Sequence, residues 1–315
     1  MCSGINPAST VRNLARSVPA TRSAPPRPRY SNGLNAPSNL EQTPLPPRVS
    51  VVVVSCNRRE LLRGCLESLE KSEGRETVQI VVVDNGSTDG SAQLENEFPN
   101  IHFFRLPKNF GLTKAMNIGW RAAKADYVLF LHEDTELEPA AIGRLAAVLD
   151  SQADAAGVVP LLVNAEGQPA PQLGALPPDG QYRPAQPSGT EPIPVQYPRG
   201  AALMLRAFVI KSMRQVDERY GQFGSDADLA AHIRRGGKKI LLVPEARTRH
   251  YGGEPYDSMR RADFLLGRAA FLGKHARLST GIQARVAAIL GPLLSFHWGE
   301  LHYTLSGQKI DGNQA

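Results

Sequence analysis

Runs of β-branched residues alternate with segments of helical spacing from residue 49 onward. The first run, residues 49–54, reads VSVVVV, which is typical of a strand buried on both faces. Apolar residues then recur at intervals of three and four between residues 61 and 69, as on one face of a helix. This alternation predicts right-handed crossovers between parallel strands. The expected fold class is therefore α/β, with a Rossmann-like, mainly parallel sheet and helices on both faces.

The alternation continues along the chain and predicts further strands and helices. Strands are expected at residues 78–84, 101–106, 127–131, 157–163 and 238–244, and helices at residues 111–124, 139–149 and 225–237. Residues 199–210 are also expected to be ordered. The segment between the last two blocks, residues 164–198, is rich in proline and glycine, so we interpret it as a long mobile loop.

The formal net charge of +6 is carried by the two ends of the chain. Residues 1–48 contribute +5 and residues 258–315 contribute +4, so residues 49–257 carry −3. An enzyme that acts on nucleic acid would concentrate positive charge around its working cleft, because phosphate neutralisation supplies most of the affinity. Nucleic acid is therefore not an expected partner.

Composition predicts three parts of the chain. Residues 1–47 are rich in Pro, Ser and Arg and lack hydrophobic periodicity, which is typical of a disordered tail. Residues 48–257 hold the alternating elements and are expected to form one domain. Residues 258–315 are expected to form a basic, helical C-terminal extension. Its cations are interleaved with Leu, Phe and Ile, a pattern that fits either docking on a membrane surface or a helix packed on the domain.

The expected compartment is the cytoplasm, with peripheral attachment to the inner face of the membrane as a further option. Cys2, Cys56 and Cys65 show neither metal-binding spacing nor a paired framework, which favours a reducing compartment. The N-terminus has no apolar signal-peptide core, and no stretch offers the roughly 18 apolar residues that spanning requires.

Polar clusters follow three of the predicted strands: SCNRR after residues 49–54, DNGSTD from residue 84, and HED after residues 127–131. Ligands of open α/β sheets bind at the carboxyl ends of the strands, so these clusters are the candidate site. No G-x-G-x-x-G or G-x-x-x-x-G-K-[ST] loop is present, which argues against an NAD-linked dehydrogenase and a nucleoside triphosphatase. A sugar-phosphate nucleotidyltransferase would also need a glycine-rich loop where SCNRR stands.

Asp84 ends the second strand, and the short polar residues after it allow the backbone to curl around a ligand. Its carboxylate could accept hydrogen bonds from the N–H of a pyrimidine or from ribose hydroxyls. The same pattern also fits an Asx turn followed by a helix cap at Ser87 or Asp89.

His132 and Asp134 lie at the end of the fourth strand, and strand alternation turns their side chains to the same side. An imidazole and a carboxylate can hold a divalent ion that in turn grips a diphosphate. Structural capping of the next helix is the alternative for this cluster.

Several blocks, in order, resemble a family 2 glycosyltransferase of the rhamnosyltransferase-like kind, with the GT-A fold. They are VSVVVVSCNRRELLRGCLESL, IVVVDNGSTDGS, NFGLTKAMNIGWRAAKADYVLFLHEDTELEP, GAALMLR and YGQFGSDADLAAHIRRGGKKILLVPEARTRHYGG. The resemblance covers about residues 49–275. It implies inverting transfer of a sugar from a nucleoside diphosphate donor of the UDP or dTDP type to an acceptor hydroxyl, assisted by Mg²⁺ or Mn²⁺.

The resemblance also implies roles for single residues. Asn57, Asp84 and Asp89 match positions that hold the nucleoside, and Asp134 matches the last acid of the D-x-D-like motif, which reaches the diphosphate through the metal. His250 matches a histidine that helps to bind the ion or the diphosphate. The implied acceptor is a glycan or a lipid-linked molecule, in cell-envelope polysaccharide or O-antigen-type assembly.

Asp226 matches the catalytic base of the family. On a helix Asp226 and Asp228 lie roughly 200° apart, so only one can face the anomeric carbon, and we assign Asp228 to structural support. Two positions depart from the family pattern: His132 stands where Asp or Asn is usual, and Ser225 stands where Glu is usual. A degenerate protein that binds nucleotide sugar without turnover is therefore the alternative function.

Overall fold

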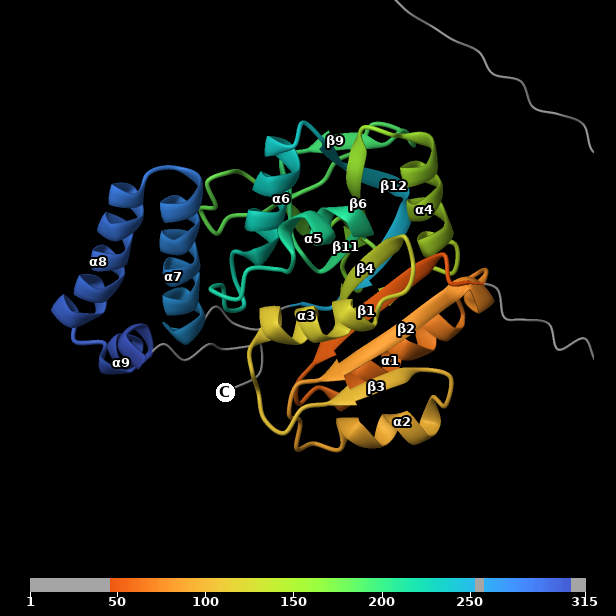
Figure 1. The fold of residues 1–315 in the computed structure, drawn as a ribbon, viewed down its shortest axis with the longest axis horizontal. Coiled ribbons are helices and arrows are strands. Elements are labelled where there is room, and N and C mark those ends of the chain that lie inside the picture. Colours follow the sequence, from red (N-terminus) through yellow and green to blue (C-terminus); the bar gives the residue numbers. More distant parts are fainter. Residues whose placement is uncertain (1–45, 253–257, 307–315) are drawn as a thin grey trace, which may run out of the picture. The chain divides into compact units, whose positions relative to one another are not determined.

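A central sheet of nine strands organises the part of the chain that the computed structural model describes, residues 46–252 and 258–306. Its strands are β1 (Val49–Ser55), β2 (Val78–Asp84), β3 (His102–Arg105), β4 (Tyr127–His132), β5 (Thr135–Leu137), β6 (Ala155–Val163), β9 (Ile193–Val195), β11 (Ala202–Arg206) and β12 (Lys239–His250). The order is β3-β2-β1-β4-β11-β6-β12-β5, and β9 pairs with β12 outside this path (Figure 1).

The sheet is parallel where the sequence shows strands alternating with helices. β1 pairs in parallel with β2 and β4, β2 with β3, and β6 with β12. β11 is antiparallel to both β4 and β6, and β12 is antiparallel to β5 and β9. A parallel pair needs a crossover that covers one face, whereas the chain between β6 and β11 contains no helix. The sheet is therefore mixed in its second half.

Helices cover both faces of the sheet, as predicted. They are α1 (Arg59–Glu70), α2 (Leu94–Glu97), α3 (Leu112–Ala122), α4 (Ala141–Ser151), α5 (Ala207–Met213) and α6 (Ser225–Arg235). On one face Leu66 of α1 and Leu145 of α4 belong to the same core cluster as Val51. On the other face α5 and α6 share a cluster with Val52, and α3 packs against Val54. Alternate residues of β1 thus anchor opposite layers.

Residues 164–198 are not the structureless loop that their composition predicts. They contain β7 (Pro171–Gly174), β8 (Arg183–Pro184) and β10 (Tyr197–Pro198), which form a second sheet in the order β10-β7-β8, and they also supply β9. These strands are short and proline-bearing, so their pairing depends on distant partners rather than on local pattern. Gly174 of β7 shows how close this packing is, because a Cβ there would lie 2.8 Å from the ring of Tyr197 in β10.

The predicted helical extension consists of α7 (Ser258–His275), α8 (Leu278–Leu294) and α9 (Trp298–Ser306) within the described residues. In Figure 1, α7 and α8 stand side by side and α9 lies near their lower ends. None of the described helices has the length and apolarity needed to span a bilayer. The predicted tail lies outside the described residues up to residue 45, and the division at residue 257 stays a prediction.

Candidate active site

The three polar clusters meet at one edge of the sheet. Ser55 is paired with Asp84, and Val54 is paired with His132, so β1, β2 and β4 end side by side. This edge is the carboxyl end of the parallel strands, where the sequence analysis places the ligand.

The predicted nucleoside-binding residues lie in two loops that hold each other. The Ser87 N–H donates to Asp84 Oδ1 at 3.0 Å, a bond that spans three residues, one more than in the Asx turn considered as an alternative. Asn57, which adopts a left-handed conformation (φ 53°), accepts a hydrogen bond from the Thr88 N–H at 2.7 Å through Oδ1. Its own N–H donates to Ser87 Oγ at 2.9 Å. Asn57 and Asp84 therefore shape the same turn.

Asp89 joins this turn to α1. Its Oδ2 accepts a hydrogen bond at 2.8 Å from the N–H of Arg59, the first residue of the helix, and its Oδ1 accepts one from the Ser91 N–H at 2.9 Å. Although partial burial opposes ionisation, the bonds from Ser91 and Arg59 lower the pKa of Asp89. The structure thus brings Asn57, Asp84 and Asp89 together, and their contact with a nucleoside stays a prediction.

His132, Asp134 and His250 form the candidate metal centre. One ligand atom from each lies within 4.8 Å of the others. His250 Nε2 is 3.4 Å from Asp134 Oδ1, and His132 Nδ1 is 3.9 Å from the same oxygen. His250 reaches this position because β12 pairs with β5, which places His250 directly opposite Thr135. The Tyr251 N–H also donates to the Asp134 carbonyl at 2.9 Å.

The electrostatics of this cluster fit a divalent cation. Burial lowers the pKa of His132 to about 4, so its imidazole is neutral near pH 7 and can act as a ligand. Burial alone would raise the pKa of Asp134, but His250, His132 and Arg58 hold it well below its usual range. Asp134 Oδ1 is buried and accepts no hydrogen bond within the described part of the chain. Such an oxygen, beside the neutral imidazole of His132 and the ring of His250, suits a cation such as Mn²⁺.

Asp226 stands in the first turn of α6 and is held by three donors. Tyr197 donates its hydroxyl to Oδ1 at 3.0 Å, the Ala227 N–H donates to Oδ1 at 2.8 Å, and the Gly200 N–H donates to Oδ2 at 3.2 Å. Tyr182 extends this series of hydrogen bonds, because its hydroxyl lies 2.5 Å from that of Tyr197. Burial nevertheless raises the pKa of Asp226, which favours a proton-accepting role.

One cavity of about 260 Å³ lies between the candidate metal centre and Asp226. His132 and Asp226 both line it, together with Arg199 and Tyr182. Asp228 instead faces α7, where Lys274 Nζ lies 2.8 Å and His275 Nε2 2.5 Å from its carboxylate oxygens. Asp226 therefore lines the cavity whereas Asp228 does not, and the assignment of Asp226 as the catalytic base stays a prediction.

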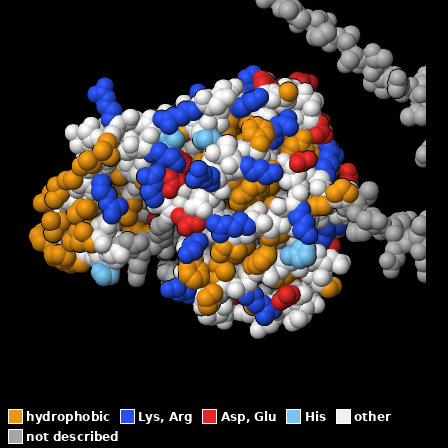
Figure 2. Space-filling model, in the orientation of Figure 1, with side chains coloured by type: hydrophobic (Ala, Val, Ile, Leu, Met, Phe, Trp, Pro, Cys, Tyr) orange, Lys and Arg blue, Asp and Glu red, His pale blue; other side chains and the backbone are white. Residues whose placement is uncertain are grey.

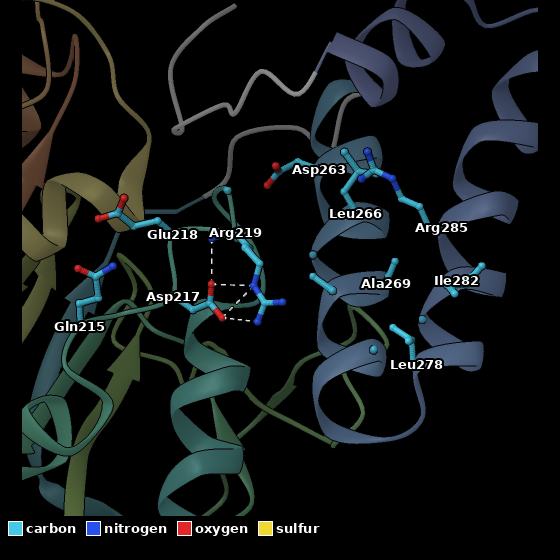
Figure 3. A pocket seen from close by; sticks show the side chains of 15 residues that line it. Gln215, Asp217, Glu218, Arg219, Asp263, Leu266, Ala269, Leu278, Ile282 and Arg285 are labelled. Atoms are coloured by element: carbon cyan, nitrogen blue, oxygen red, sulfur yellow. Dashed lines mark hydrogen bonds and ion pairs between the residues drawn. The ribbon is translucent and has the colours of Figure 1, made fainter.

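A larger open cavity, of about 870 Å³, lies between α7, α8 and the loop that carries Asp217 (Figure 3). Its carboxylate is already engaged, because Arg219 Nη2 lies 2.7 Å and Lys274 Nζ 2.9 Å from Asp217 Oδ2. None of the predicted site residues lines this cavity, so the smaller one is the candidate active site.

Residues 50–209 match the family described as Glycosyl transferase family 2. The chain belongs to this family. The match confirms the predicted family and the enzyme class, and solved relatives confirm the GT-A fold.

Two curated proteins are similar to this chain in sequence, and one solved structure is similar to it in fold. An N-acetylglucosaminyl-diphospho-decaprenol L-rhamnosyltransferase from Mycobacterium tuberculosis is 26% identical over 231 residues, covering 64% of this chain and 75% of the relative. A teichoic acid poly(glycerol phosphate) polymerase from Staphylococcus epidermidis is 34% identical over 100 residues, which are 30% of this chain and 14% of that protein. GalNAc-T7, solved with UDP, GalNAc and Mn²⁺, has a TM-score of 0.56 and 18% identity over 66% of this chain and 45% of its own.

Sequence reasoning missed Tyr182, Tyr197 and Arg58. The tyrosines lie in the segment interpreted as a loop, so nothing in the local pattern pointed to them. Arg58 belongs to SCNRR, and its Nη1 lies 3.4 Å from Asp134 Oδ2. Its position directly after a parallel strand was the signal that could have identified it.

Proposed function

We propose that this chain transfers a sugar, with inversion, from a nucleoside diphosphate donor to an acceptor hydroxyl. The observation that carries the proposal is the cavity shared by His132, of the candidate metal centre, and Asp226. A group that stabilises a leaving diphosphate and a group that accepts a proton thus face one space. Family membership supplies the reaction type, and this geometry supplies the two ends of the reaction.

Asp226 is the proposed base. It takes the proton of the acceptor hydroxyl as the acceptor oxygen forms its bond to the anomeric carbon. The bond between that carbon and the diphosphate oxygen breaks, and the diphosphate leaves with its electron pair. Attack from the face opposite the leaving group inverts the anomeric configuration.

The donor side is proposed to use Asn57, Asp84 and Asp89 around the nucleoside. A divalent cation, Mg²⁺ or Mn²⁺, held by His132, Asp134 and His250 would neutralise charge on the leaving diphosphate. Arg199, which lines the same cavity, adds a positive charge on the protein itself. The two imidazoles favour Mn²⁺ over Mg²⁺.

The proposed acceptor is a glycan or a lipid-linked molecule of the cell envelope. Both curated relatives support this choice through their names, one of which specifies a diphospho-decaprenol acceptor and the other a teichoic acid polymer. A donor of the UDP or dTDP type is proposed, and the UDP complex of GalNAc-T7 supports it.

The first test measures thermal stabilisation by UDP, dTDP and GDP, each with and without Mn²⁺, followed by turnover of the matching nucleotide sugars. A nucleotide at a hundredfold its dissociation constant should stabilise the protein by about 2.7 kcal/mol. We expect Asp226→Asn to lower kcat by roughly 10²- to 10⁴-fold while donor affinity stays within a factor of two or so. Asp154→Asn, the same change at an exposed ion pair with Lys239, is the control and should leave both unchanged.

Three outcomes would count against the proposal. Stabilisation by no nucleotide, in protein shown to be folded, would leave the strand-end clusters as turns and caps. Turnover in Asp226→Asn near the wild-type rate would place the base elsewhere. Donor binding by the wild type without transfer to any offered acceptor would favour the degenerate nucleotide-sugar-binding protein.

A further inference from the structure

The helix α8 exposes a row of large apolar side chains. Leu278, Ile282, Val286 and Leu290 follow one another at intervals of four, so they share one face of the helix. The exposed fraction of these side chains falls between 45% and 72%. Beyond them the row is extended by Leu293, Leu294, Phe296, Trp298 and Leu305. We refer to these nine residues as the apolar face.

The apolar face is continuous in space. Figure 2 shows hydrophobic side chains gathered over the part of the surface that α8 and α9 form. The opposite side of α8 is used inside the protein, where Gly281 and Ala288 are buried. Gly281 allows close contact with α7, because a Cβ there would lie 2.5 Å from the Gly273 Cα. A patch of this kind marks an interaction surface when it exceeds the scattered exposure of ordinary proteins.

In the described part of α7–α9 the exposed charges are positive, whereas Asp217 and Glu218 of a neighbouring loop line the cavity that Leu278 and Ile282 also line. Residues 258–306 contain six Lys or Arg and two acids, and both acids, Asp263 and Glu300, are buried. The Tyr303 hydroxyl donates to Asp263 at 2.7 Å, so this carboxylate is engaged inside the helical layer. Arg261, Arg277 and Arg285 are exposed. The partner surface should therefore be apolar and negatively charged.

We propose that the apolar face of α8 and α9 docks on an anionic lipid bilayer, with its leucines and Trp298 in the interfacial layer and the arginines at the headgroups. Leu, Phe and Trp on one side of the described helices, with exposed arginines on the same helices, are the features of a helix that lies in a membrane interface. A second copy fits less well, because a twofold contact would bring the exposed Arg277 and Arg285 of each copy toward those of the other.

Docking would place α8 and then α7 between the bilayer and the active-site cavity. α8 packs on α7, and Arg260 of α7 lines the cavity that holds Asp226. This inference concerns a surface and does not depend on glycosyl transfer. It holds or fails whatever the outcome of the nucleotide experiments.

The test is co-sedimentation of the full chain with vesicles of phosphatidylcholine, alone or mixed with phosphatidylglycerol. The wild type should bind the mixed vesicles, and high salt should weaken binding. Leu294→Asp/Trp298→Asp should lower the partition coefficient at least tenfold, because each substitution removes the favourable free energy of transferring an apolar side chain from water into the bilayer. Arg261→Gln/Arg277→Gln should lower it about fivefold per charge at low salt. Phe208→Asp is the matched control, since Phe208 is 50% exposed on α5, and it should bind as the wild type does.

Circular dichroism verifies that each variant is folded, and light scattering gives the mass in solution. Equal binding by wild type and Leu294→Asp/Trp298→Asp would overturn the proposal, as would failure of the wild type to bind. Equal binding to neutral and mixed vesicles would overturn the requirement for anionic lipid in the proposal. A wild-type dimer that Leu294→Asp/Trp298→Asp dissociates, with no vesicle binding, would make the face an interface between copies.

Discussion

At the level of single residues, the proposed base is tuned by opposing effects. Burial raises the pKa of Asp226, whereas the hydrogen bonds from Ala227, Tyr197 and Gly200 stabilise the carboxylate and lower it. A base must be ionised to accept a proton, so activity should fall as pH decreases through the pKa of Asp226. Tyr197 is therefore a positioning residue whose loss should be visible in a pH profile.

We expect Tyr197→Phe to shift the acid limb of kcat/KM to higher pH. The lost hydrogen bond favours the ionised carboxylate, so its removal raises the pKa of Asp226, by about one unit for a bond to a charged group. The measurement is kcat/KM against pH with saturating cation. Tyr127→Phe removes a hydroxyl bonded to Asp150 at 2.6 Å and should leave the acid limb in place. An unchanged limb in Tyr197→Phe would show that the bond does not tune the base.

The residues of the site differed in how far sequence could predict them. Strand alternation alone put His132 and Asp134 on one side, and the structure places them in one cluster. His250 came only from the family resemblance, because 118 positions separate it from His132 and the pairing of β12 with β5 joins them. Tyr197 was missed because its role depends on α6, which no local pattern relates to β10.

Among the secondary-structure elements, α3 shows how closely a helix can approach a sheet. Gly119 faces β1 and β2, and a Cβ there would lie 2.4 Å from Val52 Cγ1 and 3.1 Å from Val83 Cγ2. Valine side chains are stiff at χ1, so these methyl groups cannot easily move aside. The glycine therefore sets the distance between this helix and the strands that end at the active site.

We predict opposite effects for two glycine-to-alanine changes in helices. Gly119→Ala should lower the free energy of unfolding by about 1–3 kcal/mol, because overpacking outweighs the gain in helix propensity. Gly143→Ala in α4 meets nothing within 4 Å and should raise it by up to about 1 kcal/mol. Urea denaturation measures both. Equal stability of the two variants would mean that α3 can shift on the sheet.

Most of the central elements follow from local pattern, and the exceptions have tertiary causes. The strand predicted at residues 238–244 corresponds only to the first half of β12. β12 continues beyond Pro244, with an irregularity in its pairing between Val243 and Arg247, and ends at His250. Proline in a strand is tolerated at such irregularities, but sequence alone reads it as an end. β5 was missed because three residues carry too little pattern.

For the whole molecule, apolar and polar contacts together join the sheet domain to the helical extension: Phe271 of α7 belongs to the same core cluster as α6, and Asp228 of α6 contacts the end of α7. Asp228 is 1% exposed and contacts both Lys274 and His275 at the end of α7, while the Tyr220 hydroxyl donates to its Oδ1 at 3.2 Å. A buried carboxylate is stable only while its partners are present. This contact attaches α6 to α7 at Asp228, two residues after the proposed base Asp226.

We expect Asp228→Asn to lower the free energy of unfolding by roughly 3 kcal/mol, because it removes the buried charge that Lys274 contacts and disturbs the buried bonds to Tyr220 and His275. For a chain of this size that corresponds to a melting temperature lower by roughly 6–10 °C. Thermal unfolding followed by circular dichroism measures the change. Glu97→Gln breaks an exposed pair with Arg63 and should leave the melting temperature close to that of the wild type. Similar effects for the two variants would contradict a buried role for Asp228.

The contact of Asp228 with α7 also bears on how the protein can be shortened. A chain ending at residue 257 would keep Asp228 but lose Lys274 and His275, and an unneutralised carboxylate would face water in the first turn of α6. The same helix would also lose its packing against Phe271 of α7, and Asp226 lies in its first turn. Inactivity of such a fragment would therefore say nothing about whether α7–α9 bind the acceptor, whereas substitutions on the apolar face leave the turn intact.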